Sequence, residues 1–211
     1  MIQTRPDISF SVQWLSRYLQ NPTKIHLNAA KNLLKYINST KGILICFGAE
    51  SNIILVGFAD SDFAGNKDTS LSTWGYLFKI AGGPVCWKSK RASTVALSTL
   101  EAEFIALYEA TREIEWLIGL YQEIEEFMNF PILILGDNQG ANDSTFNPIY
   151  YSRTKHTLLK FHYLREKVAE GIIDITYLET SKMPADGLTK ALVPQKHLRF
   201  LDMIGLKPAE L

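Results

Sequence analysis

The sequence predicts an α/β fold in which helices flank a mixed β-sheet. Three short apolar segments, residues 53–59, 74–80 and 84–87, follow one another with only polar turns between them, which is typical of an antiparallel meander. Two later apolar segments, 132–135 and 172–178, are separated by helical patterns, so the strands they form are expected to be parallel to a neighbour.

The composition indicates a globular protein with an ordinary core. The chain has 211 residues, of which 46% are apolar and 21% charged, and its formal net charge is zero. These values exclude a disordered or collagen-like chain. The apolar runs are far shorter than the roughly 20 residues that a membrane helix needs. The first residues lack the features of a signal peptide, and Cys46 and Cys86 cannot frame a disulfide scaffold. We therefore expect an intracellular protein with no membrane partner.

Apolar residues show helical spacing in the first part of the chain. Apolar residues recur at helical intervals from Ile8 to Leu19, and a second helix follows Pro22 to about Thr40, so residues 1–48 are expected to form a helical hairpin. This segment holds six Lys and Arg residues against one Asp, which makes it a candidate for contact with phosphates. A solvated helix surface explains the same charges.

The longest predicted helix begins at a capping box. Ser98 and Glu101 have the spacing of that motif, and the helix they open runs to near residue 127. A further helix is expected at about 157–170, and helical turns are expected after Pro184 and Pro194.

Two of the predicted strands end in an aspartate. Asp60 follows the first strand and Asp137 follows the fourth. Ligands of such sheets gather beyond the carboxyl ends of parallel strands, so both carboxylates are candidates for a functional site. Asp62 lies two residues after Asp60 and shares its face if the strand continues, so periodicity alone does not choose between the two.

Five short motifs carry a family resemblance. They are GFADSDFAG at 57–65, ALSTLEAEF at 96–104, GDNQ at 136–139, SRTKH at 152–156 and ADGLTK at 185–190. In this order and at these approximate spacings, they resemble the ribonuclease H domain of copia-type retrotransposon polyproteins. Residues 4–8 and 35–37 resemble the end of the reverse transcriptase that precedes this domain.

The resemblance implies a ribonuclease H-like fold with a five-stranded mixed sheet, and hydrolysis of the RNA strand of an RNA–DNA hybrid. It assigns the catalytic and metal-binding roles to Asp60, Glu103, Asp137 and Asp186, which would hold two Mg²⁺ or Mn²⁺ ions. Hard cations of this kind prefer oxygen ligands, so no Cys or His is needed. The capping box accounts for Glu101 and leaves Glu103 free. Asp137 and Asp186 could also serve as acids at helix N-termini.

Candidate contacts to nucleic acid fall into three groups. Cations follow the third strand at Lys88, Lys90 and Arg91, where phosphates could bind. A second basic group comprises Arg153, Lys155 and His156. Small polar side chains beside the proposed ligands, Ser61, Asn138 and Gln139, are suited to reading a 2′-hydroxyl.

The resemblance also suggests a division of the chain and its partners. Residues 1–48 would be a remnant of the reverse transcriptase, 52–190 the ribonuclease H-like domain, and 191–211 a C-terminal helical tail. A tyrosine followed by two adjacent aspartates, the polymerase signature, is absent, so we expect no DNA synthesis by this chain alone. The expected partners are the hybrid and the polymerase part of the polyprotein, within a cytoplasmic virus-like particle if the parent element is active.

Two departures leave a second reading open. The loop at 177–185 contains no histidine, although many ribonucleases H carry one there, and Leu71 stands near the usual place of an arginine. The alternative to an active nuclease is a catalytically idle relic or connector module that binds nucleic acid.

Overall fold

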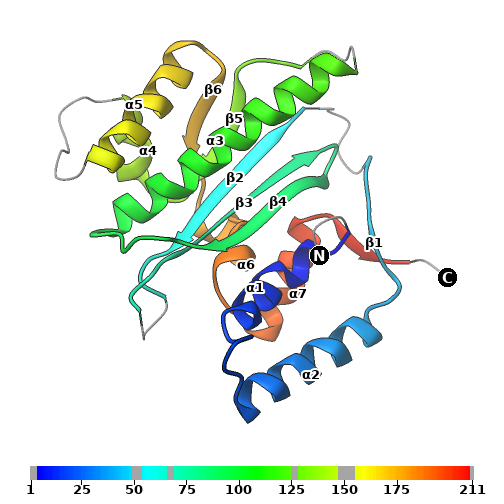
Figure 1. Cartoon of the computed structure of the whole chain (residues 1–211). Helices are drawn as coiled ribbons and strands as arrows, with labels where there is room; N and C mark the ends of the chain where they lie inside the picture. Colours follow the sequence, from blue (N-terminus) through cyan, green and yellow to red (C-terminus); the bar gives the residue numbers. More distant parts are fainter. Residues whose placement is uncertain (1–3, 49–53, 66–68, 125–127, 147–154, 210–211) are drawn as a thin grey trace.

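The computed structural model describes residues 4–48, 54–65, 69–124, 128–146 and 155–209 (Figure 1). For 143–146 and 155–157 the description covers the backbone only. No helix in these ranges is long and apolar enough to cross a membrane.

A five-stranded mixed sheet forms the centre of the molecule, in the spatial order β4-β3-β2-β5-β6. The strands are β2 (Val56–Asp62), β3 (Thr73–Ile80), β4 (Gly83–Arg91), β5 (Ile132–Gly136) and β6 (Ile173–Tyr177). The first three pair antiparallel, whereas β5 is parallel to both β2 and β6. The predicted meander and the predicted parallel strands are both confirmed.

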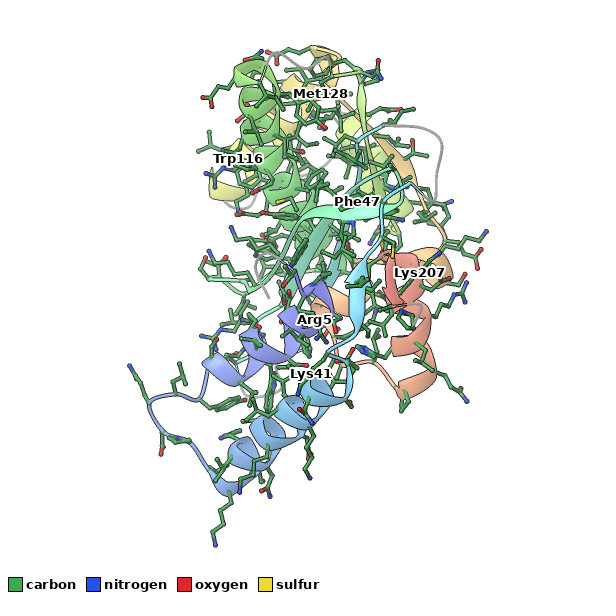
Figure 2. The ribbon with its side chains drawn as sticks, turned by 90° about the vertical axis from the view of Figure 1, so that its right-hand side faces the viewer. Arg5, Lys41, Phe47, Trp116, Met128 and Lys207 are labelled. Carbon is green, nitrogen blue, oxygen red and sulfur yellow. The ribbon has the colours of Figure 1, made fainter. Side chains whose placement is uncertain are left out.

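Two helices cover one face of the sheet. They are α3 (Thr99–Glu123) and α5 (Lys155–Ala169), and α4 (Gln139–Phe146) lies beside them after β5 (Figure 1). The rings of Phe104 on α3 and Phe161 on α5 stack with centroids 3.5 Å apart within the main apolar core. Trp116 projects from the outer surface of α3, where 58% of it is exposed (Figure 2).

Shorter helices cover the opposite face. They are α1 (Ser9–Ser16), α6 (Asp186–Thr189) and α7 (Pro194–Met203), with single 3₁₀ turns at η1 (Pro6–Ile8) and η2 (Thr180–Lys182). Leu77 of β3, Leu188 and Phe200 form a second apolar core here. This layer holds Asp186 against the sheet.

A small two-stranded sheet joins the two ends of the chain. Strand β1 (Ile43–Ile45) pairs antiparallel with β7 (Leu206–Pro208). The tail expected to be helical over 191–211 therefore contains α7 and then a strand, because Gly205, at φ +72°, ends the helix and turns the chain toward β1. Both expected N-terminal helices are present, α1 and α2 (Lys24–Ser39), while the division into separate domains stays a prediction.

Candidate active site

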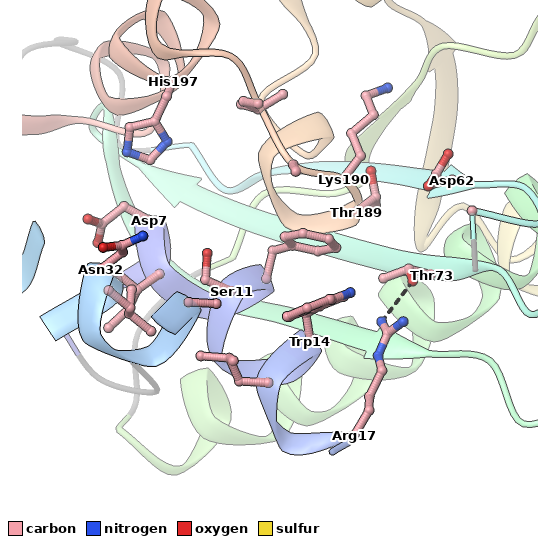
Figure 3. A pocket seen from close by; sticks show the side chains of 18 of the residues that line it. Asp7, Ser11, Trp14, Arg17, Asn32, Asp62, Thr73, Thr189, Lys190 and His197 are labelled. Atoms are coloured by element: carbon pink, nitrogen blue, oxygen red, sulfur yellow. Dashed lines mark hydrogen bonds between the residues drawn. The ribbon is translucent and has the colours of Figure 1, made fainter. Parts of the chain in front are cut away.

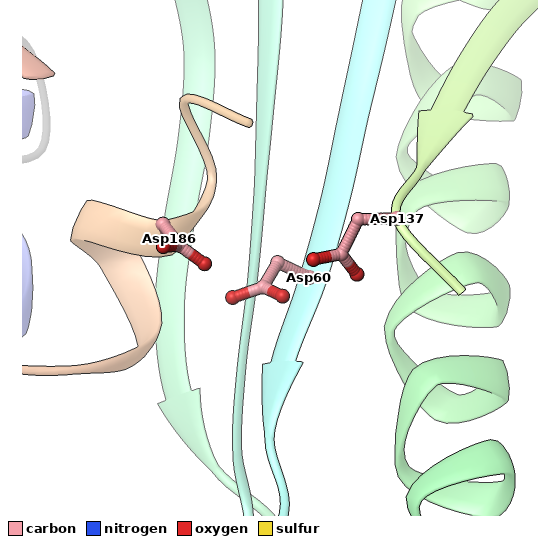
Figure 4. Close-up of side chains that lie close together, drawn as sticks. All are labelled: Asp60, Asp137 and Asp186. Carbon is pink, nitrogen blue, oxygen red and sulfur yellow. The ribbon is translucent and has the colours of Figure 1, made fainter. Parts of the chain in front are cut away.

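Three carboxylates from distant parts of the sequence meet at one edge of the sheet. Asp60 lies near the end of β2, and Asp137 directly follows the parallel strand β5, with Ala59 and Gly136 in register. Asp186 is the first residue of α6. One carboxylate oxygen from each of Asp60, Asp137 and Asp186 lies within 4.8 Å of the other two (Figure 4). The carboxyl ends of parallel strands thus create the site, as expected for such a sheet.

The structure distinguishes Asp60 from Asp62. Asp60 is 2% exposed and belongs to the cluster of three carboxylates, whereas Asp62 is half-buried and does not. Burial is the largest cause that raises the pKa of Asp62, and the nearby Lys190 opposes it. Asp62 therefore lies outside the cluster, but near enough to Lys190 and Asp186 for their charges to affect its pKa.

Glu103 stands next to the cluster, on the second turn of α3. Its neighbour Glu101 is used by the helix start: the Leu97 N–H donates to Glu101 Oε2 at 2.7 Å, and the Glu101 N–H donates to Ser98 Oγ at 3.1 Å. Burial, and then the charge of Asp60, raise the pKa of Glu103 to about 9, while hydrogen bonds from Ser61 lower it. Glu103 therefore lies close enough to Asp60 and Asp137 for their charges to raise its pKa, but it is not one of the three carboxylates that lie within 4.8 Å of one another.

Burial and the closeness of the carboxylates disfavour the ionised forms of Asp60 and Glu103. Burial, followed by the charge of Asp186, raises the pKa of Asp60 to about 7. Crowded carboxylates in a buried place are stable only if protonated or neutralised by a cation. Lys190 provides part of that charge, with its Nζ 2.6 Å from Asp186 Oδ1. The negative charge that Lys190 does not neutralise is suited to divalent cations, which take carboxylate oxygens as ligands.

Two threonines fix carboxylates of the cluster. Thr189 Oγ1 donates to Asp60 Oδ2 at 2.5 Å, and both groups are buried. Thr180 Oγ1, in the loop that lacks a histidine, donates to Asp137 Oδ2 at 2.8 Å. Thr189 and Lys190 lie inside a recognised motif, but their contacts were not predicted. No sequence pattern indicated Thr180, because its partner lies 43 residues away.

The predicted nucleic-acid contacts fall in different places. Ser61 is buried next to Asp60, and Asn138 caps α4, its Oδ1 accepting from the Ala141 N–H at 3.0 Å. Gln139 is exposed at the start of α4. The structure therefore brings Ser61 and Asn138 to the cluster.

The predicted basic contacts lie apart from the acids where they are described. Lys88, Lys90 and Arg91 lie on β4, the edge strand, and the Lys90 Nζ is 5.9 Å from the centre of the Trp74 ring. Arg153 falls outside the described residues, as do the side chains of Lys155 and His156.

The strand order and the acids at the carboxyl ends of β2 and β5 define the chain as a domain with the ribonuclease H-like fold. Among solved structures, it is similar to LC11-RNase H1, isolated from compost by a metagenomic approach. That comparison gives a TM-score of 0.49 at 15% identity and covers 65% of this chain and 93% of the other.

Sequence comparison then gives the family. The chain is 39% identical over 206 residues to the retrovirus-related Pol polyprotein from transposon TNT 1-94 of Nicotiana tabacum, which covers 98% of this chain and 15% of that protein. It is 34% identical over 203 residues to the corresponding polyprotein from transposon RE1 of Arabidopsis thaliana, covering 96% of this chain and 14% of that protein. The chain belongs to the retrovirus-related Pol polyproteins of copia-type transposons. It spans about one seventh of the length of these relatives, and no protein-family model matches it.

Proposed function

We propose that this chain is a metal-dependent endoribonuclease that hydrolyses the RNA strand of an RNA–DNA hybrid during reverse transcription. The observation that carries the proposal is the cluster of Asp60, Asp137 and Asp186, with oxygens within 4.8 Å of one another and Glu103 beside them. Membership in the Pol polyprotein family supports the same activity.

The acidic residues would hold two Mg²⁺ or Mn²⁺ ions. Asp60, Glu103, Asp137 and Asp186 offer only hard oxygen donors. Burial first, and then the charge of a neighbouring carboxylate, raises the pKa of Asp60 and of Glu103, and a bound cation would offset both effects. When bound, such ions lower the pKa of an attacking water and neutralise charge that develops on the scissile phosphate.

The protein's own groups position these ligands. The hydroxyl of Thr189 restricts the orientation of the Asp60 carboxylate, and Thr180 does the same for Asp137. Lys190 holds Asp186 and adds positive charge next to the site of reaction. We propose that Ser61 and Asn138, which neighbour Asp60 and Asp137 in sequence, contact the 2′-hydroxyl that distinguishes RNA from DNA.

The substrate phosphates would meet the basic groups. Lys88, Lys90 and Arg91 on β4 are the described candidates, and Arg153, Lys155 and His156 are proposed on the resemblance alone. Cations of this kind set the position of a duplex without reading its sequence.

We also propose a role for each part of the chain. Residues 52–190 would be the nuclease, 1–48 the end of the reverse transcriptase and 191–211 a tail that packs on both. The polymerase part of the polyprotein would be the partner, and a cytoplasmic particle the location. We expect no DNA synthesis from this chain, because the polymerase signature is absent from its sequence.

The test is cleavage of a labelled RNA–DNA hybrid in Mg²⁺ and in Mn²⁺, with duplex DNA as the substrate control. We expect cutting of the RNA strand only, and its loss in Asp60→Asn. The matched control variant is Glu101→Gln, which alters an acid of the helix cap and keeps activity. No cutting by the unmodified chain, with hybrid binding retained, would instead support the idle binding module.

A further inference from the structure

An arginine of the N-terminal segment is held beside the central sheet, and among the described residues it has no carboxylate partner. Arg17 follows α1, and one of its terminal nitrogens (Nη2) donates to Gln13 Oε1 at 2.5 Å and to Thr73 Oγ1 at 3.0 Å. Its Nε atom is buried and has no hydrogen-bond partner. A buried N–H without an acceptor is costly, so a positioned guanidinium of this kind is suited to receive one.

A second arginine lies close to the first. Arg91 ends β4, and the register places it directly opposite Thr73. Burial is the main cause that lowers the pKa of Arg17, and the charge of Arg91 lowers it further. Within the described ranges, no carboxylate forms an ion pair with either guanidinium. Two cations at Thr73, neither of them paired with a described carboxylate, favour a bound anion on the β4 side of Thr73, away from Asp62.

Arg17 lines a large pocket that extends to residues in contact with the acidic cluster, and Arg91 lies beside that pocket, opposite Thr73. The pocket has a volume of about 930 Å³, and Trp14, Arg17, Thr73, Thr189 and Lys190 are among the residues that line it (Figure 3). Thr189 and Lys190 are the residues that contact Asp60 and Asp186. The pocket therefore extends from Arg17 and Thr73 to the two residues that contact the carboxylates.

The register of the sheet gives the approximate distance between the carboxylates and the two arginines. Thr73 lies opposite Asp62, two residues along β2 from Asp60. Two strand residues span roughly 7 Å, and the rise along a nucleic-acid strand is about 3.4 Å per nucleotide. Thr73 and Arg91 also lie one and two strands to the side of β2, at about 4.8 Å per strand, so the total offset is roughly 8–12 Å. A polynucleotide with its reacting phosphate at the carboxylates could thus place a phosphate two or three nucleotides away at the arginine pair.

We propose that Arg17, Arg91 and Thr73 together bind a backbone phosphate of the nucleic acid, so that the segment before the nuclease sheet supplies part of the substrate site. The proposal rests on the proposed function for the identity of the polymer, an RNA–DNA hybrid. Guanidinium groups bind phosphate through paired N–H donors, and the Thr73 hydroxyl can donate a third hydrogen bond. Trp14, on the same pocket wall, offers an aromatic face to the strand.

The experiment measures hybrid binding by the full chain in EDTA, where cleavage cannot occur. Fluorescence anisotropy at 50 to 200 mM salt would compare the unmodified chain with Arg17→Gln, Arg91→Gln and the control Arg112→Gln. Arg112 is an exposed cation on α3, away from the pair. We expect each of the first two variants to weaken binding several-fold and to reduce the salt slope by about one, while the control leaves both unchanged.

Further measurements distinguish free inorganic phosphate from a phosphate of the hybrid as the bound anion. Inorganic phosphate is expected to raise the melting temperature only weakly, and Arg17→Lys to recover part of the hybrid affinity. A large, Arg17-dependent effect of inorganic phosphate with unchanged hybrid affinity would show a free-anion site and overturn the proposal. Because the described hydrogen bond between the end of α1 and Thr73 comes from Arg17 and not from Arg91, Arg91→Gln remains informative if Arg17→Gln unfolds.

Failure of this inference is distinct from failure of the proposed function. Unchanged affinity and salt slope in both arginine variants would overturn the phosphate site, even if the hybrid is cleaved normally. Weakened binding in both variants would support the site, even if the chain cleaves nothing.

Discussion

Asp60 and Glu103 hold carboxyl groups whose ionisation is opposed first by burial and then by the charge of a neighbouring carboxylate, Asp186 for Asp60 and Asp60 for Glu103. Their pKa values are higher in the folded chain, about 7 and about 9, than in an unfolded one. In the absence of divalent ions, their contribution to stability is therefore complete below about pH 4. It is lost as the pH rises through about 7 for Asp60 and about 9 for Glu103.

Because the ionised carboxyl of Asp60 destabilises the folded chain, removing its charge should stabilise the chain above about pH 7. In EDTA at pH 8, Asp60→Asn is expected to raise the melting temperature by several degrees, since about 1 kcal/mol corresponds to about 2–4 °C at this chain length. At pH 4 the variant and the unmodified chain should melt alike, because the carboxyl is then already neutral. Calorimetry with and without Mg²⁺ checks both points: the ion should stabilise the unmodified chain and leave the variant unaffected. Equal melting temperatures at pH 8 would contradict the prediction.

A second residue-scale prediction concerns Thr189, which donates to Asp60 from a buried position. Thr189→Val keeps the shape of the side chain and removes the donor, so the Mg²⁺ affinity should fall about 10- to 100-fold, as is typical for a group that orients a metal ligand. Titration calorimetry with Mg²⁺ measures this directly. Thr180→Val is the matched comparison, and its effect should be smaller because its bond to Asp137 is exposed to water. An unchanged affinity in Thr189→Val would show that Asp60 needs no support from this hydroxyl.

At the scale of elements, two glycines should respond in opposite directions to the same change. Gly119 lies within α3, and a Cβ atom there meets nothing within 4 Å. Gly119→Ala should stabilise the chain by about 0.5–1 kcal/mol, because alanine loses less backbone entropy in a helix. Gly205 has φ +72°, and a Cβ atom there would collide with the carbonyl of Gly82. Gly205→Ala should cost more than about 1 kcal/mol. Urea unfolding curves measure both, and a gain in stability for Gly205→Ala would contradict the assignment.

The elements also show what sequence patterns can and cannot predict. The central sheet was predictable because each of its strands carries an apolar pattern between turn residues. Strands β1 and β7 have three residues each, and they form only because segments more than 160 residues apart meet. No local pattern carries that pairing.

The same limit applies to the candidate site. The carboxyl ends of β2 and β5 indicated Asp60 and Asp137, and the family motifs added Glu103 and Asp186. The roles of all four residues stay predictions. The contacts from Thr180 to Asp137 and from Arg17 to Thr73 join different parts of the fold, so periodicity gave no sign of them.

At the scale of the whole molecule, a buried polar network attaches the N-terminal segment to the rest of the chain. Asp7 accepts from Arg5 Nε at 2.9 Å and from the Tyr36 hydroxyl at 2.7 Å, and that hydroxyl lies 3.0 Å from His197 Nε2 on α7. Arg5 also donates to Thr40 Oγ1 at 2.8 Å, after the end of α2. The network and the pairing of β1 with β7 therefore hold the segment that carries Arg17 in a fixed place beside the acids.

Asp7→Asn tests whether this attachment is part of the folded unit. The Asp7 side chain is fully buried and Arg5 is 15% exposed, so removing the carboxylate leaves a nearly buried guanidinium without its partner, at a cost of about 3 kcal/mol. That cost corresponds to a fall of roughly 6–12 °C in melting temperature for a chain of this length. Glu109→Gln is the control, because its ion pair with Arg112 at 3.9 Å is exposed and contributes little. If Asp7→Asn melts at the same temperature as the control, the central sheet and its helices do not need the N-terminal helices for stability. A single transition at a lower temperature would instead show that the N-terminal helices and the sheet unfold together.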